Sequence, residues 1–335
     1  MNIIQVDGNI QGSGKSSIIG ALSLYLREKG KKVSYYKPFS SSASEDPDPP
    51  FIASELLGVS APVHPVTPPD GPITPELEQT IKANIDKSAA STDTLFIEGP
   101  DIDSANGVLG QTLHGITGGK RILVSQWDKN SQDNLSSNPS SQEAIIINGY
   151  PLHRSNMVSS QITHATDNST PIIGAIPEDR FMLSVEIQQI LDHLDGTWFN
   201  EPENTRQLVQ KFLIGGNIMD SGPNYFCRHN NQAVITRAER PDIHMACFKG
   251  DTKCVIMTGG GKPTEYVQIE ARNLDIPLIM VESNTMNTAQ SLEGLAGKSV
   301  CHNVEKIRHF KNLIEGHLDM QKLDSILLSN GLSPS

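Results

Sequence analysis

One segment near the N-terminus combines the residue types and the spacing that bind a polyphosphate. Residues 8–16 read Gly-Asn-Ile-Gln-Gly-Ser-Gly-Lys-Ser, after an apolar run and before a helical pattern that ends near Gly30. Glycines let successive backbone N–H groups turn toward a phosphate, a lysine reaches the β- and γ-phosphates, and a serine hydroxyl holds Mg²⁺. The segment therefore predicts a P-loop that binds a nucleoside triphosphate, with ATP and Mg²⁺ as the expected ligands. The expected binding residues are Gly8, Gly12, Ser13, Gly14, Lys15, Ser16 and Ser17.

The first glycine of this segment lies one place earlier than the strict pattern requires. The strict spacing would put a glycine at Asn9, whereas the sequence has it at Gly8. The placement of the loop between an apolar strand and an amphipathic helix is the stronger evidence, because the helix start adds its positive dipole end.

Two further polar side chains follow predicted strands. Lys37 follows the strand at 32–36, and Glu98 follows the apolar strand at 94–97. Function concentrates at the carboxyl ends of parallel strands, so Lys37 and Glu98 join Lys15 as candidate catalytic residues, with Ser16 and Glu98 as metal ligands. A surface lysine before a proline and an acid that caps a turn are the alternatives. Weaker candidates for approaching Mg²⁺ are Asp7, Asp101 and Asp103.

The elements that must position these side chains follow a repeating pattern. Short apolar runs alternate with helical patterns over residues 1–195, which predicts a parallel α/β sheet. A Pro-, Ser- and Asp-rich loop occupies 40–75, and a helix is expected at 183–194. A linker is expected at 195–203, followed by a smaller α/β domain at 204–300. An amphipathic C-terminal helix at 304–330 is expected to pack on a domain face or a dimer partner.

Composition excludes several classes of function. The 335 residues carry a formal net charge of −11, which disfavours binding to nucleic acid. The sequence has no apolar run long enough to span a membrane and no signal-peptide pattern, so we expect a cytoplasmic protein. Its four cysteines form no Cys-x-x-Cys pair, which favours reduced core thiols over a metal cage.

The first half of the chain resembles the dethiobiotin synthetase group of P-loop proteins. The resemblance rests on the early Gly8, on Lys37-Pro38 and on residues 96–99 (Phe-Ile-Glu-Gly). It implies that Lys15 and Lys37 lie near a reacting phosphate and carbamate, and that Ser16 and Glu98 bind Mg²⁺. By the same analogy, Asn148, Pro177 and Glu178 are the adenine-binding positions. The chain departs from that group at residues 9–11 and at Pro100-Asp101, where the acceptor site would lie.

The second half resembles the DRTGG domain. Residues 233–243 and 254–260 carry this resemblance, with Glu239 in place of the first Asp of the motif. The combination is similar to the N-terminal half of long bacterial phosphotransacetylases, without the acetyltransferase domain, and implies a homodimer. The turn at 258–261 is expected either to contact an anion through backbone N–H groups or simply to connect a strand to a helix. Glu239 and Arg240 are expected to form a salt bridge, within the chain or across a dimer, rather than a site.

Two functions remain open on this basis. The first is an ATP- and Mg²⁺-binding regulatory protein with weak ATPase activity, whose second domain dimerises or senses a small-molecule effector. The alternative is an ATP-dependent enzyme, either a ligase of the dethiobiotin synthetase type or a small-molecule kinase. In the enzyme, the loop at 40–75 would form the acceptor site.

Overall fold

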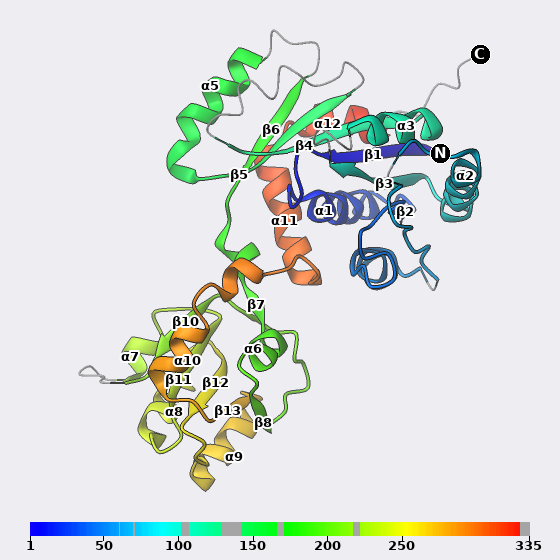
Figure 1. Cartoon of the computed structure of the whole chain (residues 1–335). Coiled ribbons are helices and arrows are strands. Elements are labelled where there is room, and N and C mark those ends of the chain that lie inside the picture. The colour runs from blue at the N-terminus through cyan, green and yellow to red at the C-terminus, as the bar shows by residue number, and fades with distance from the viewer. Residues whose placement is uncertain are drawn as a thin grey trace. The chain divides into compact units, whose positions relative to one another are not determined.

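The computed structural model describes residues 1–59, 61–69, 71–101, 107–128, 142–165, 171–216 and 222–328. These residues form two compact units, which Figure 1 shows coloured along the chain. The first unit comprises Met1–Asp179 together with the chain from Cys301 onward, and the second comprises Arg180–Val300. The division therefore falls at residue 180, whereas the sequence led us to expect it after residue 195.

A parallel sheet of six strands forms the centre of the first unit. Every neighbouring pair in it is parallel, in the order β2-β3-β1-β4-β5-β6. The strands are β1 (Asn2–Gly8), β2 (Val33–Tyr36), β3 (Thr94–Asp101), β4 (Lys120–Gln126), β5 (Ala144–Tyr150) and β6 (Ile172–Pro177). This arrangement confirms the predicted α/β fold class. Because all the strands are parallel, their carboxyl ends share one edge, and β1 brings its loop to the middle of that edge.

Helix α1 of the first unit begins at Lys15, within the predicted P-loop segment. Thr74 caps α2, since its hydroxyl accepts a hydrogen bond from the N–H of Leu77 at 3.3 Å. None of the helices in the described parts of the chain is long and apolar enough to cross a membrane. The helices are α1 (Lys15–Glu28), a π-helix η1 (Pro49–Leu56), α2 (Pro75–Ala89), α3 (Gly107–Thr117), a 3₁₀ turn η2 (Leu152–Arg154) and α5 (Ser155–Ala165).

The C-terminal tail forms two helices that belong to the first unit. These are α11 (Val304–His317) and α12 (Met320–Leu328), and the N–H of Asp319 between them donates to the carbonyl of Ile173 at 2.7 Å. The apolar stripe of α11 packs on α1, where a Cβ added at Gly20 would lie 3.2 Å from Ile307. Figure 1 shows these two helices side by side. The stripe therefore covers a face of its own domain.

The second unit is built on a five-stranded sheet in the order β10-β11-β12-β13-β8. The neighbouring strands β10, β11, β12 and β13 run parallel to one another, and β8 pairs antiparallel with β13 at one edge of the sheet. The strands of this unit are β7 (Val185–Glu186), β8 (Thr197–Asn200), β9 (Leu208–Val209), β10 (Lys211–Ile214), β11 (Gln232–Arg237), β12 (Thr252–Thr258) and β13 (Leu278–Val281). The helices are η3 (Arg180–Leu183), α6 (Ile187–His193), α7 (Gly222–Phe226), α8 (Pro241–Cys247), α9 (Glu265–Asn273), α10 (Thr285–Ser291) and η4 (Leu295–Lys298).

Two sequence predictions fail at the start of the second unit. The helix expected at 183–194 begins only at Ile187, because Val185 and Glu186 pair with β9. The linker expected at 195–203 contains β8, because the backbone of this segment pairs antiparallel with β13 and Trp198 packs against the core. The glycine and proline that indicated a linker only flank this strand.

Candidate functional site

The predicted P-loop connects the carboxyl end of β1 to the start of α1. Gly12 and Gly14 have φ angles of 78° and 98°, in the left-handed region that glycine enters without strain. Gly8 is required for a different reason. A Cβ at this position would overlap the hydroxyl of Ser13 and would lie 2.7 Å from the carboxylate of Asp101 and 3.0 Å from Nζ of Lys15. The early glycine is therefore the one that lets these side chains meet above the strand.

Unused hydrogen-bond donors gather at this turn. The buried hydroxyl of Ser13 has no hydrogen-bond partner among the described residues. The backbone N–H groups of Gly14, Lys15 and Ser16 likewise have no acceptor in the described chain, as expected for the first turn of a helix. Lys15 is paired with Asp101. Buried polar groups are normally satisfied, so free donors beside a lysine fit a phosphate group.

A possible Mg²⁺ position lies between Ser16 and Glu98. The hydroxyl of Ser16 lies 3.3 Å from Oε1 of Glu98, and adjacent ligands of an octahedral Mg²⁺ lie about 2.9 Å apart. The hydroxyl of Tyr35 donates to the other carboxylate oxygen at 2.7 Å and holds it in place. Burial, together with the nearby charge of Asp48, raises the pKa of Glu98. The donor set therefore fits a hard divalent cation, which would stabilise the ionised form of this carboxylate.

Lys37 lies in a cage of carboxylates at the same edge. Its Nζ is 2.8 Å from Asp46, 2.5 Å from Asp48 and 3.5 Å from Glu98. Burial alone would lower the pKa of Lys37, but the charges of Glu98 and Asp48 outweigh burial and raise it. Lys37 is therefore a fixed ammonium cation. The alternative of a surface lysine before a proline does not describe this environment.

Asp46 and Asp48 are the site residues that the sequence analysis missed. Burial alone would raise the pKa of Asp48, but His302 and Lys37 lower it to about 2. Both aspartates lie just before η1 in the loop assigned to an acceptor site. The signal that could have found them is the pair of acids, spaced two apart, immediately before a helix start.

The three positions assigned to adenine lie at the ends of β5 and β6. The side-chain amide of Asn148 donates to the carbonyl of Ser13 at 2.8 Å, so this residue contacts the P-loop itself. Pro177 ends β6, and the N–H of Glu178 donates to the carbonyl of Tyr150 at 2.8 Å. These residues therefore lie at the same edge of the sheet as the P-loop.

Asp7 is not a metal-facing residue, which corrects the weaker prediction. Its carboxylate pairs with the fully buried Arg121, at 2.8 Å from Nε and 2.5 Å from Nη2. It also accepts from the side chain of Gln5 at 2.9 Å. A Cβ at Gly99 would overlap this carboxylate, so the glycine leaves room for the ion pair. Asp103 lies outside the described residues.

The second glycine-rich turn, residues 258–261, uses its backbone differently. The N–H of Gly259 donates to Ser283 at 3.0 Å, and that of Gly260 donates to Val281 at 3.1 Å. A Cβ at Gly260 would lie 2.5 Å from the carboxylate of Glu282. Because the N–H groups of Gly259 and Gly260 are occupied and carboxylates adjoin the turn, its geometry favours a strand-to-helix connection over an anion contact.

Glu239 and Arg240 form no salt bridge with each other within the described chain. Arg240 instead forms a bidentate ion pair with Asp242, in which Nε lies 2.9 Å from Oδ1 and Nη2 lies 2.7 Å from Oδ2. It also donates to the carbonyl of Gly216 at 3.2 Å. The planar guanidinium matches both oxygens of the acid two residues later, where helix α8 begins. Glu239 lies against Gly261 instead.

Comparisons with known proteins identify part of the chain. Residues 189–295 match the DRTGG domain family, so this prediction is confirmed, and the match lies within the second unit. The chain is also similar to the CBS and DRTGG domains of the regulatory region of Clostridium perfringens pyrophosphatase, solved with its activator diadenosine tetraphosphate. That similarity has 13% identity and a TM-score of 0.30, over 52% of this chain and 62% of the other.

Two further solved structures are similar to this chain. One is the signal recognition particle receptor FtsY from Elizabethkingia anophelis, at 15% identity and a TM-score of 0.38, over 53% of this chain and 59% of that one. The other is the MinD cell division protein of Aquifex aeolicus, at 14% identity and a TM-score of 0.37, over 55% of this chain and 84% of that one. The alignments span less than two thirds of the pyrophosphatase region and of FtsY.

Proposed function

We propose that the chain is an ATP- and Mg²⁺-binding regulatory protein with weak ATPase activity. The observation that carries the proposal is the group of unused donors at the P-loop, next to Lys15 and to the pair formed by Ser16 and Glu98. The β- and γ-phosphates would replace Asp101 as the partner of Lys15, and Mg²⁺ would bind Ser16 and Glu98. Adenine would lie toward Asn148, Pro177 and Glu178.

The charge of the site supports a regulator over an enzyme with an anionic acceptor. Four carboxylates, from Asp46, Asp48, Glu98 and Asp101, surround two ammonium groups, from Lys15 and Lys37. The formal sum is 2 − 4 = −2, which complements the magnesium of MgATP and repels a second anion. Residues 189–295 match the DRTGG family. This match supports the second half of the two-domain combination that resembles the N-terminal half of long bacterial phosphotransacetylases.

One observation favours the alternative, an ATP-dependent ligase of the dethiobiotin synthetase type or a small-molecule kinase. Lys37 reaches Glu98, the same carboxylate that Ser16 contacts, so it could act on a reacting γ-phosphate. A cationic or neutral acceptor would then bind beside Asp46 and Asp48.

Calorimetry and an ATPase assay on the full chain test the proposal. We expect tight binding of ATP that requires Mg²⁺, together with slow release of ADP. Brisk turnover on ATP alone would contradict the regulatory role. A metabolite that accelerates ADP release would establish the enzyme instead.

We also propose that the second unit forms a homodimer. Helix α9 leaves Tyr266 and Ile269, three residues apart on one face, 53% and 51% exposed. Exposed apolar side chains grouped in this way are typical of an interface. Sedimentation equilibrium should show a dimer for the natural chain and a monomer for Tyr266→Glu. Tyr25→Phe, in the first unit, is the matched control.

A further inference from the structure

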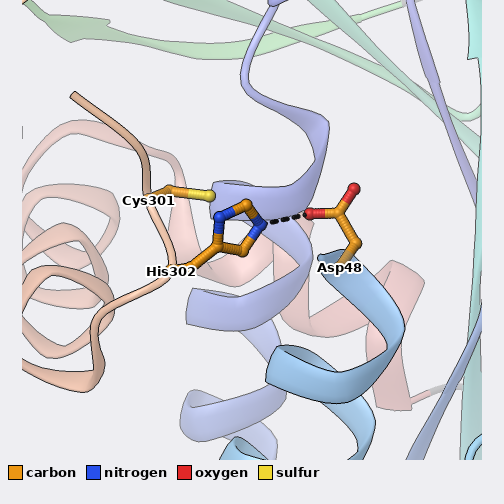
Figure 2. A group of neighbouring side chains, drawn as sticks. All are labelled: Asp48, Cys301 and His302. Carbon is orange, nitrogen blue, oxygen red and sulfur yellow. Dashed lines mark hydrogen bonds and ion pairs between the residues drawn. The ribbon is translucent and has the colours of Figure 1, made fainter. Parts of the chain in front are cut away.

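Three potential metal ligands of different chemistry meet beside the nucleotide site. One side-chain ligand atom from each of Asp48, Cys301 and His302 lies within 4.8 Å of the other two. Figure 2 shows the sulfur of Cys301 next to the imidazole ring of His302, and the ring turned toward the carboxylate of Asp48. The Nε2 atom of His302 lies 2.8 Å from Oδ1 of Asp48. The three ligand atoms therefore lie in one small cluster.

Asp48 and His302 are each held in place by a partner of their own. Lys37 binds the second oxygen of Asp48 at 2.5 Å, which leaves the first oxygen facing His302. The ring of Phe51 meets the ring of His302 edge-on, with 5.3 Å between their centres. Burial raises the pKa of the Cys301 thiol to about 12, and the neighbouring side chain of Ser17 opposes this rise. Outer partners that orient the ligands in this way are a regular feature of metal sites.

The charge around this point favours a cation. The buried carboxylates of Asp46, Asp48 and Glu98 lie around the ammonium group of Lys37, and the buried Lys306 adds a positive charge near Cys301, so 2 − 3 gives a formal charge of −1 before the thiol ionises. The side chains of Asp48 and His302 are only 10% and 19% exposed, so water screens this charge poorly. A divalent ion would neutralise the excess.

We propose that Asp48, Cys301 and His302 form a site for a zinc-like transition metal. A thiolate, an imidazole and a carboxylate are together the ligand set that Zn²⁺ takes, with a fourth position left for water. Mg²⁺ prefers oxygen ligands and has them at Ser16 and Glu98, so the two sites differ in chemistry. The sequence favours core thiols because its cysteines are scattered, but the fold brings together Asp48 and His302, 254 residues apart.

Binding at this site involves no oxidation or reduction. The metal takes the place of the thiol proton of Cys301, which passes to solvent, and binds His302 in its neutral form. Cys301 is the first residue of the chain as it returns from the second unit to the first. The metal would therefore fix this connection beside Ser17 and Lys37.

A titration of the full chain with Co²⁺, without nucleotide, tests the proposal. Cobalt bound to a thiolate has a near-ultraviolet charge-transfer band that cobalt on oxygen ligands lacks. We expect this band to saturate at one equivalent, to yield to Zn²⁺ and to resist excess Mg²⁺. The band should disappear in Cys301→Ser. In His302→Gln the affinity for Co²⁺ should fall at least tenfold, since metal ligands and their neighbours contribute about that much.

The exposed Cys227 provides a matched control. Cys227→Ser should keep the band. Because Cys247 and Cys254 are fully buried, this result assigns the band to Cys301 even if the Cys301→Ser variant does not fold. A natural chain without the band, or a band that survives in Cys301→Ser or is lost in Cys227→Ser, would overturn the proposal. The absence of nucleotide keeps this outcome separate from that of the ATP proposal.

Discussion

Each unit of this protein carries a glycine-rich turn between a central parallel strand and a helix, but we propose phosphate binding at only one of the two turns. Residues 9–14 leave β1 and enter α1, while residues 259–264 leave β12 and enter α9. At the first turn the N–H groups of Asn9 and Ser13 are paired, but the Ser13 hydroxyl and the N–H groups of Gly14 to Ser16 have no partner among the described residues. At the second, Gly259 and Gly260 donate to carbonyls near the end of β13, and Glu282 adjoins them.

The comparison shows that glycines make a turn possible but do not make it a site. The left-handed φ angles are similar, at 78° and 98° for Gly12 and Gly14 and 86° and 67° for Gly259 and Gly260. What differs is whether the donors of the turn are already paired and which charge faces them. Four experiments on the two turns and their units test this distinction.

Removing the lysine of each turn should have the most unequal effect. Lys15→Ala should weaken ATP binding about 100-fold or more, because it removes the cation that faces the phosphates and leaves them unpaired. Lys262→Ala, the matched change after the second turn, should leave the affinity unchanged. Calorimetry with MgATP measures both. Equal affinities for the natural chain and Lys15→Ala would contradict the assignment of the site.

Acid should weaken the second unit through His244. This side chain is fully buried, neither ring nitrogen has a partner among the described residues, and burial lowers its pKa from 6.5 to about 4. The unfolded chain therefore binds a proton more readily between these values, and stability is lost as pH falls from 6.5 toward 4. At pH 5 the loss should be about 2 kcal/mol.

Denaturant unfolding at pH 7 and pH 5 measures this loss. His244→Leu should flatten the pH dependence, since leucine carries no proton, and the exposed His153→Ala should not. An unchanged pH dependence in His244→Leu would show that another group is responsible.

Substituting a glycine near each turn should separate binding from stability. Gly8→Ala should weaken ATP binding about tenfold, because its Cβ would displace Ser13 and the pair of Lys15 with Asp101. Gly260→Ala should instead cost about 1 kcal/mol of stability through its left-handed φ, without changing ATP affinity. Measurements of ATP affinity and of the free energy of unfolding on both variants distinguish the two effects. A loss of ATP affinity in Gly260→Ala would indicate that the second turn contacts the nucleotide.

The smallest effect should follow from freeing Lys15. Asp101→Asn removes the carboxylate that occupies this lysine, so affinity for ATP measured without Mg²⁺ should rise about threefold. The exposed Asp86→Asn is the control for net charge. A weaker affinity in Asp101→Asn would mean that Asp101 assists binding rather than competing with the phosphates.

Much of the fold could be predicted because its central strands are continuous apolar runs buried on both faces. The strands around Phe96, Ile146 and Ile256 are of this kind. The prediction failed at 183–203, where Val185 and Trp198 lie in short strands whose partners, β9 and β13, are distant in the sequence.

The site could be predicted only where its residues are neighbours in sequence. Residues 8–16 form a local motif, Lys37 follows β2, and Glu98 lies in β3 directly after its apolar run. The partner of Asp7 is Arg121, 114 residues away, and pairings of that kind leave no local pattern. For the same reason the meeting of Asp48 with Cys301 and His302 could not be foreseen from a sequence with scattered cysteines.

Hydrogen–deuterium exchange with and without MgATP tests the central claim most directly, because it observes both turns in one molecule. The account predicts that nucleotide slows exchange in residues 9–17, where the N–H groups of Gly14, Lys15 and Ser16 are unused, and leaves residues 258–264 unchanged. Protection of residues 258–264 with no change in residues 9–17 would contradict it.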